Sequence, residues 1–185
     1  MKHLFTIIAV LLVAATTVMA QDGARKYGVK SAAVKIETEM MGQKVLTTSW
    51  FDNYGDLEAS VSDMGVMKVA TILKDGKTWM VNEAAKQVQE MPAQEGQVNY
   101  LNLTDEIVAK YSIKEEGKET VAGKECTKYS MKISQMGQTV DVSVSVWNGY
   151  PMKTISSAMG SSVTVAVTEF VEGPVDPAHF DVPQY

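Results

Sequence analysis

The residues best able to do chemistry are few in this sequence and stand far apart. Cys126 is the single cysteine, and a lone thiol needs a neighbour that lowers its pKa before it becomes reactive. Met64 and Met67 could offer two thioethers to Cu(I), which is a weak site without further soft ligands. His179 is far in sequence from the only other histidine, His3. We therefore expect no metal site and no cofactor.

Two pairs of adjacent carboxylates are the other candidates. Asp105-Glu106 and Glu115-Glu116 would point in different directions on a helix or a strand, so they indicate solvated charge rather than an acid and its base. The common motifs of hydrolases, zinc proteases and nucleotide-binding proteins do not occur in a usable setting. A carboxylate pair that only folding brings together, as in glycosidases, remains an open alternative. The residues favour a protein without a catalytic site.

The composition narrows the class of protein further. The chain has 185 residues, 45% of them hydrophobic, and a formal net charge of −5. An acidic chain lacks the basic surface of a nucleic-acid-binding protein. A single cysteine forms no internal disulfide, and this length suits one folded domain with a real core.

The N-terminus has the pattern of a secretory signal peptide. Lys2 precedes an apolar run from Leu4 to Ala15, and Val18-Met19-Ala20 provides small or tolerated residues for cleavage. The run is shorter than the ~20 residues of a membrane-spanning helix, which argues against an uncleaved anchor. We expect residues 1–20 to be removed and residues 21–185 to form one periplasmic domain without a membrane span. Gln21 would follow the cut, so the cysteine of a lipoprotein is missing.

Most of the remaining chain alternates apolar and polar residues, as a half-buried antiparallel strand does. Asp75-Gly76 between two such runs is typical of a tight hairpin. The pattern predicts about eleven strands. The clearest runs are 32–40, 44–52, 56–63, 66–74, 78–82, 86–90, 124–134, 139–147, 152–158 and 162–171.

One short helix interrupts the strands. Thr104 is a good N-cap and is followed by Asp105 and Glu106, which suit the positive end of a helix dipole. Ile107 and Tyr111 would share one face of a helix that ends near Ser112. The triplet at 102–104 also matches a glycosylation sequon, but capping is the favoured interpretation.

Methionine-glycine pairs suggest an internal repeat. Met41-Gly42 and Met64-Gly65 recur 95 residues later at 136–137 and 159–160, and Asn53 recurs as Asn148. Shared ancestry and convergence of similar hairpin turns both explain the pattern. The ten methionines beyond residue 20 are either flexible core filler or the lining of an adaptable apolar cleft.

The C-terminal third resembles the closing segment of the LolA/LolB-like lipoprotein-localisation factors and their uncharacterised exported relatives. The residues that carry the likeness are Val146-Trp147, the run 149–153, Gly160, the strand 163–170, Asp176 and the run 180–183. The resemblance implies a mainly β fold, an antiparallel half-barrel of about eleven strands whose concave side is covered by one or two short helices. It also implies that the concave side holds acyl chains.

A half-barrel of this kind would bind an apolar ligand by removing it from water. Alternation and bulk select the candidate lining residues, for each of which ordinary core packing is the alternative. They are Leu46, Trp50, Val61, Met67, Val69, Leu73, Trp79, Val81, Tyr129 and Met131. We expect a non-catalytic binding or carrier protein for a lipid or another hydrophobic small molecule. The alternative is a structural or protein-interaction module of the cell envelope, its barrel filled by its own side chains.

Overall fold

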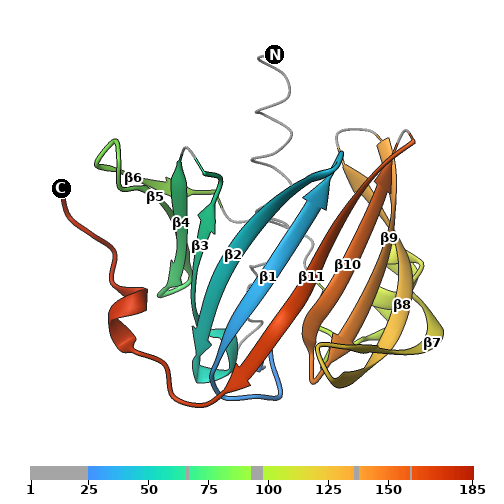
Figure 1. Cartoon of the computed structure of the whole chain (residues 1–185). Helices are drawn as coiled ribbons and strands as arrows, with labels where there is room; N and C mark the ends of the chain where they lie inside the picture. The colour runs from blue at the N-terminus through green and yellow to red at the C-terminus, as the bar shows by residue number, and fades with distance from the viewer. Residues whose placement is uncertain (1–24, 66, 93–97, 136–137, 159) are drawn as a thin grey trace.

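A computed structural model describes residues 25–185 apart from 66, 93–97, 136–137 and 159. Eleven strands form one antiparallel sheet in the order β6-β5-β4-β3-β2-β1-β11-β10-β9-β8-β7 (Figure 1). Their bounds are β1 (Ala32–Met40), β2 (Gln43–Asp52), β3 (Leu57–Asp63), β4 (Lys68–Lys74), β5 (Lys77–Asn82), β6 (Gln87–Met91), β7 (Lys114–Val121), β8 (Lys124–Gln135), β9 (Gln138–Trp147), β10 (Tyr150–Ala158) and β11 (Ser161–Glu172). The sheet curves without closing, so the expected half-barrel is confirmed.

Ten strands match the runs that alternation predicted, with ends that differ by two residues at most. The exception is β7, which the pattern missed. Its sequence is mostly charged, and the register of its pairing with β8 shifts between Glu115 and Gly117. A strand that lies at the edge of a sheet and faces solvent does not need the apolar alternation on which the prediction depended.

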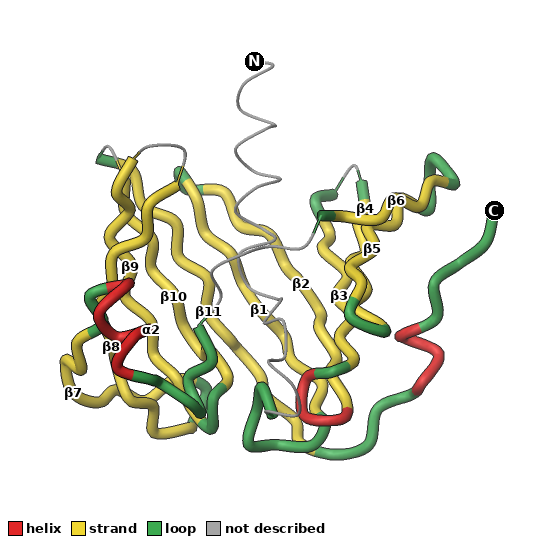
Figure 2. Tube along the Cα trace, turned by 180° about the vertical axis from the view of Figure 1, so that it is seen from behind, coloured by secondary structure: helices red, strands yellow, loops and turns green. Residues whose placement is uncertain are grey.

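The helix α2 (Asp105–Tyr111) is the one that capping chemistry predicted. The Thr104 hydroxyl accepts a hydrogen bond from the Ile107 backbone N–H at 3.3 Å, and Ser112 ends the helix in a left-handed conformation. Its apolar side packs on β8 and β9, where Met131, Val142 and Val144 are buried. Figure 2, seen from behind, shows α2 in front of β8, inside the curve of the sheet.

The register defines which side chains share the concave face. On β1 and β2, Val34 lies opposite Ser49 and Ile36 lies opposite Thr47. The same row continues onto β3, where Thr47 pairs with Ser62. It also continues through β11, β10 and β9 to the residues under α2. Alternate residues point to the opposite, outer face.

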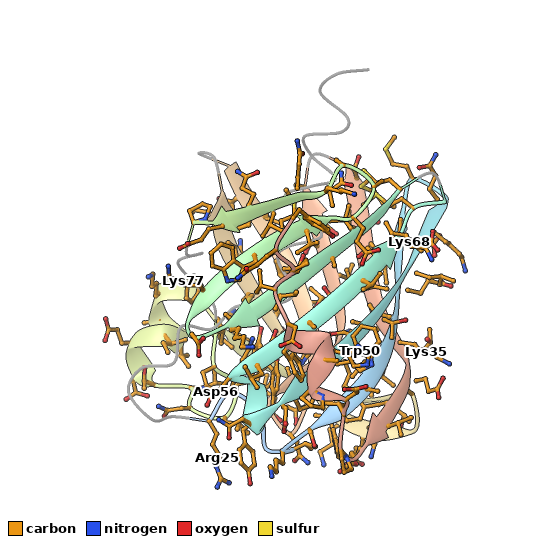
Figure 3. All side chains as sticks on the ribbon, turned by 90° about the vertical axis from the view of Figure 1, so that its left-hand side faces the viewer. Arg25, Lys35, Trp50, Asp56, Lys68 and Lys77 are labelled. Atoms are coloured by element: carbon orange, nitrogen blue, oxygen red, sulfur yellow. The ribbon has the colours of Figure 1, made fainter. Side chains whose placement is uncertain are left out.

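The C-terminal segment covers part of this outer face. After β11 the chain forms a short 3-10 helix, η3 (Pro177–Phe180), which lies against β3 and β4. Phe180 is buried there, and the His179 ring stacks on Trp50 at 3.9 Å between centroids. Figure 3 looks at this side and shows Trp50 beside the C-terminal segment. The outer face of β2–β5 is therefore a second core.

The segment before β1 ties together the two halves of the curved sheet. The Tyr27 N–H bonds to the Tyr54 carbonyl in η2 (Asn53–Gly55) at 3.0 Å. The Gly28 N–H bonds to the Asn148 carbonyl, in the turn between β9 and β10, at 2.8 Å. Gly55 is required by this packing, since a Cβ there would lie 2.9 Å from the Tyr27 ring and its φ is +97°.

The repeat suggested by the Met-Gly pairs coincides with two equivalent sets of strands. β9 begins and ends 95 residues after β2. The strands around it match as well, with β8, β10 and β11 as the counterparts of β1, β3 and β4. Each set is a four-stranded meander, and the two meanders meet where β1 pairs with β11. The second copies of the Met-Gly turns, at 136–137 and 159–160, include positions outside the described residues. The predicted signal peptide also lies outside them.

Candidate ligand-binding face

The concave face divides into two walls of different chemistry. The wall formed by β8–β11 carries the aliphatic side chains of Met131, Val142, Val144, Val163, Val165 and Val167, and β10 adds the hydroxyls of Thr154 and Ser156 between them. The wall formed by β2–β5 carries six hydroxyl groups beside apolar residues such as Val69 and Leu73, namely those of Thr47, Ser49, Ser60, Ser62, Thr71 and Thr78. We call these the valine wall and the hydroxyl wall.

Most side chains of the two walls are buried, but each wall also has half-buried ones. Val165 on the valine wall is half-buried, and so are Ser60 and Thr71 on the hydroxyl wall. Val69, next to Thr71 on the same face of β4, is half-buried as well. The concave face therefore keeps both apolar and polar surface within reach of a molecule that enters the curve of the sheet.

The end of the valine wall under α2 carries two stacked tyrosines. The rings of Tyr100 and Tyr129 lie 6.0 Å apart, and the Tyr100 hydroxyl lies 3.9 Å from the Met131 sulfur. Burial raises the pKa of Tyr100, with a smaller contribution from Tyr129, so its hydroxyl stays neutral at physiological pH. At the edge of this end, Glu115 on β7 lies opposite Tyr129. Burial raises the pKa of Tyr129, and the charge of Glu115 makes a smaller contribution in the same direction.

The base of the concave face contains a buried ion pair. Lys26 donates a hydrogen bond to Glu58 Oε1, and the Tyr27 hydroxyl donates to the same oxygen at 3.0 Å. Glu58 Oε2 is buried and has no hydrogen-bond partner in the structure. Tyr27 lies between Phe51 and Tyr150, at centroid distances of 4.8 and 4.9 Å. Burial raises the pKa of Tyr27, and the Glu58 charge raises it further.

The structure divides the ten predicted lining residues between the two faces of the sheet. Five are on or next to the concave face: Met67, Val69, Leu73, Tyr129 and Met131. The other five point outward: Leu46, Trp50, Val61, Trp79 and Val81. Trp50, Trp79 and Val81 pack against the C-terminal segment, whereas Leu46 is 61% exposed. The assumption that all ten line one concave surface is therefore wrong.

Sequence reasoning also missed the hydroxyl wall and Glu58. A signal was present, because Thr47 and Ser49 alternate along one run and Ser60 and Ser62 along the next. Antiparallel pairing of adjacent runs places such residues side by side. The prediction missed these residues because it selected lining residues by bulk, and serine and threonine side chains are small.

The residues first considered for chemistry lie apart from this face or are unreactive. Cys126 is fully buried, and burial raises the pKa of its thiol. His179 stacks on Trp50 at the outer face, beside the buried Phe180, as expected of an anchoring loop. Within the described ranges, no three histidine, cysteine, aspartate or glutamate side chains come together as a metal site. No helix in the same part of the chain is long and apolar enough to cross a membrane.

Neither a family model nor a curated protein matches the sequence, but solved structures match the fold. An uncharacterised conserved protein from Thermus thermophilus has 12% identity and a TM-score of 0.59, with 84% of this chain and 86% of that chain aligned. A chain of the MucA/MucB complex from Pseudomonas aeruginosa has 15% identity and a TM-score of 0.61. That match covers 83% of this chain but only 56% of the other, so this protein spans little more than half its length.

A LolA superfamily protein from Nitrosomonas europaea also matches, with 11% identity and a TM-score of 0.40 over 90% of this chain and 99% of that chain. At these identities the similarity concerns the fold. The half-barrel expected from the LolA/LolB-like resemblance is the fold observed.

Proposed function

We propose that the protein is exported to the periplasm and there binds or carries a hydrophobic ligand, such as the acyl chain of a lipid, without changing it chemically. The observation that carries the proposal is the valine wall, a row of aliphatic side chains on the concave side of an unclosed sheet. Val165 and Val69 on this side are half-buried rather than sealed in a core. Each methylene group of a ligand that leaves water for such a surface contributes ~0.8 kcal/mol.

The fold supports this proposal physically. The base is closed by the segment that includes Lys26 and Tyr27, while α2 covers the part of the concave side over β8 and β9. A preformed apolar surface closed at one end and partly covered suits a ligand that enters lengthwise. The buried Lys26–Glu58 pair and the β1–β11 pairing keep the two walls in place without a ligand.

Lipid extraction and a fluorescent fatty-acid probe test the proposal. The protein from Gln21 onward should co-purify with a lipid detectable by mass spectrometry, or bind the probe with a saturable signal. Val165→Lys should abolish binding because it places an ammonium on the valine wall. Thr164→Lys is the matched control, since Thr164 neighbours Val165 but faces outward opposite Glu39. Val69→Lys provides a second test on another strand.

Circular dichroism must show that each variant is folded. Loss of binding in the two inward variants, with binding kept in Thr164→Lys, supports the proposal. The absence of both a co-purifying lipid and probe binding in the unmodified protein refutes it.

The two edges of the sheet favour a second candidate function, a protein-interaction module. The β7 edge is protected by charge and by the irregular register at Gly117. Its charged residues are Lys114, Glu115, Glu116, Lys118 and Glu119. The β6 edge has a single charge within the strand, Glu90, which pairs with Lys77 at 3.2 Å. An edge strand with little charge can accept an added strand from a partner protein.

The second candidate has its own test. A photo-crosslinking amino acid placed at Gln89 in β6 should form an adduct with an envelope protein in cells. The same group placed at Lys118 in β7 should form none. Equal labelling at both edges, or none at Gln89, contradicts the module. MucB, which has been solved in complex with MucA, shows that a protein of this fold forms a complex with another protein.

A further inference from the structure

The two meanders place different side chains at equivalent points of the concave face. Thr47 and Ser49 on β2 correspond to Val142 and Val144 on β9, 95 residues later. The registers give a further equivalence. Thr71 lies opposite Ser60, whereas Val165 lies opposite Thr154. At three equivalent positions, therefore, the first meander has a hydroxyl group and the second has an isopropyl group. On β3 and β10 both meanders have hydroxyl groups, since Ser60 and Ser62 correspond to Thr154 and Ser156.

The hydroxyl wall is organised by hydrogen bonds. The Thr47 and Ser62 hydroxyls lie 2.9 Å apart across β2 and β3. The Ser49 hydroxyl donates to the Ala59 carbonyl at 3.2 Å. Ser60 and Thr71 face each other on β3 and β4 and remain half-buried. Hydrogen bonds within the sheet therefore hold Thr47, Ser49 and Ser62 in place. Ser60 and Thr71 are within reach of a ligand.

The distribution of charge on this wall favours an uncharged ligand head over an anionic one. Among the described concave-face residues of β2–β5, Glu58 is the only charged side chain. Its neighbour Lys26 is already paired with it, and Oε2 still lacks a donor. A negatively charged head on this wall would meet neutral hydroxyls and a carboxylate but no unpaired cation from these strands. A neutral head that exchanges hydrogen bonds with the hydroxyls needs no cation to replace its hydration.

We infer that the ligand is an amphiphile whose acyl chain lies on the valine wall and whose head is uncharged and rich in hydroxyl groups, such as a glycerol ester or a sugar. This inference rests on the proposed function, because it assumes that the concave face binds a lipid. It adds selectivity to that function. Hydrogen bonds from Ser60 and Thr71 favour a hydroxylated head, and the described residues of β2–β5 offer no unpaired cation on this face to an anionic one.

Two probes with the same chain separate head from tail. 1-Monomyristoylglycerol and myristate share a tetradecanoyl chain and differ in the head, and at pH 8 only myristate is charged. We expect the protein from Gln21 onward to bind the glycerol ester at least about tenfold more tightly by calorimetry, both probes being kept below their micelle concentrations. A tenfold difference corresponds to about 1.4 kcal/mol.

The double variant Ser60→Ala/Thr71→Val removes the two half-buried hydroxyls directly. Valine has nearly the shape of threonine, and the second meander carries Val165 at the position equivalent to Thr71, so the backbone accommodates it. Alanine at Ser60 removes the hydroxyl and adds no bulk. We expect the preference for the glycerol ester to fall to about threefold or less, while myristate binds at least as tightly as before. Thr48→Val is the matched control, because Thr48 lies between Thr47 and Ser49 but faces outward.

The outcomes distinguish the two levels of proposal. Equal affinity for the two probes, tighter binding of myristate, or a preference unchanged in the double variant overturns the inference about the head and leaves a carrier of acyl chains. If neither probe binds the unmodified protein, the proposed function itself fails. A preference that disappears in the double variant and survives in Thr48→Val supports both.

Discussion

The buried pair Lys26–Glu58 makes a prediction that can be measured without knowing the ligand. The two side chains are 8% and 5% exposed, so both charges have lost most of their hydration. Replacing either one by methionine leaves the other charge buried, supported only by weaker partners such as the Tyr27 hydroxyl. Each single variant should therefore lose about 3–5 kcal/mol of unfolding free energy.

The double variant should behave differently. Lys26→Met/Glu58→Met removes both charges and also removes the unpartnered Glu58 Oε2. Replacing a buried pair by apolar side chains of similar volume is often close to neutral, so the double variant should lie within about 2 kcal/mol of the unmodified protein. The double-mutant cycle should then give a coupling energy of about 3 kcal/mol or more.

Urea unfolding followed by tryptophan fluorescence and circular dichroism measures this cycle. Lys35 and Glu169 form the control pair, which joins β1 and β11 on the outer face with side chains 63% and 49% exposed. Its coupling should be below about 1 kcal/mol. Additive losses at Lys26 and Glu58, or a coupling no larger than that of the control, would refute the view that burial dominates this pair.

Two further predictions concern the outer face and the base. Phe180→Ala should lower the free energy of unfolding by about 3–5 kcal/mol because Phe180 is buried against β3–β5, whereas Tyr185→Ala, at a side chain 58% exposed, should change it little in the same urea titrations. Burial raises the pKa of Tyr27 and Tyr150, so folding keeps their protons above pH 10, where the unfolded chain loses them. The contribution of these tyrosines to the free energy of unfolding is complete below about pH 10. It is lost as the pH rises, by about 1.4 kcal/mol per pH unit for each tyrosine. In urea titrations from about pH 8 to 11.5, the free energy of unfolding should therefore fall less steeply with pH when either tyrosine is changed to phenylalanine.

The strands could be predicted from the sequence because each depends mainly on local alternation. Ten strands and α2 were found in this way, since one face of nearly every strand packs on a core and the Thr104 cap is a local signal. β7 could not be found, because solvent lies on most of its surface and Gly117 interrupts its register. Such a strand is specified by its pairing with β8 rather than by its own composition.

The candidate site could be predicted only in part, for a topological reason. Alternation shows which residues share a face of a strand, but it does not show which face is concave. The choice is harder on β2–β5 because their outer face is also apolar, and the partner that covers it is distant in sequence. Trp50 is covered by His179, and Val81 by Phe180. Bulky residues therefore indicated the C-terminal core, while the concave face is distinguished by smaller ones.

The contrast between the two meanders is what connects the fold to a function. Threonine and valine both favour strands, so the backbone does not require Thr47 where the second meander has Val142. In a purely structural core a buried hydroxyl costs free energy unless it is hydrogen-bonded, and valine avoids that cost. The first meander offsets it by pairing Thr47 with Ser62, but Ser60 and Thr71 remain half-buried on an accessible face. Those two hydroxyls are the ones to which the proposed recognition of a polar head gives a role, and the preference between the two probes tests it.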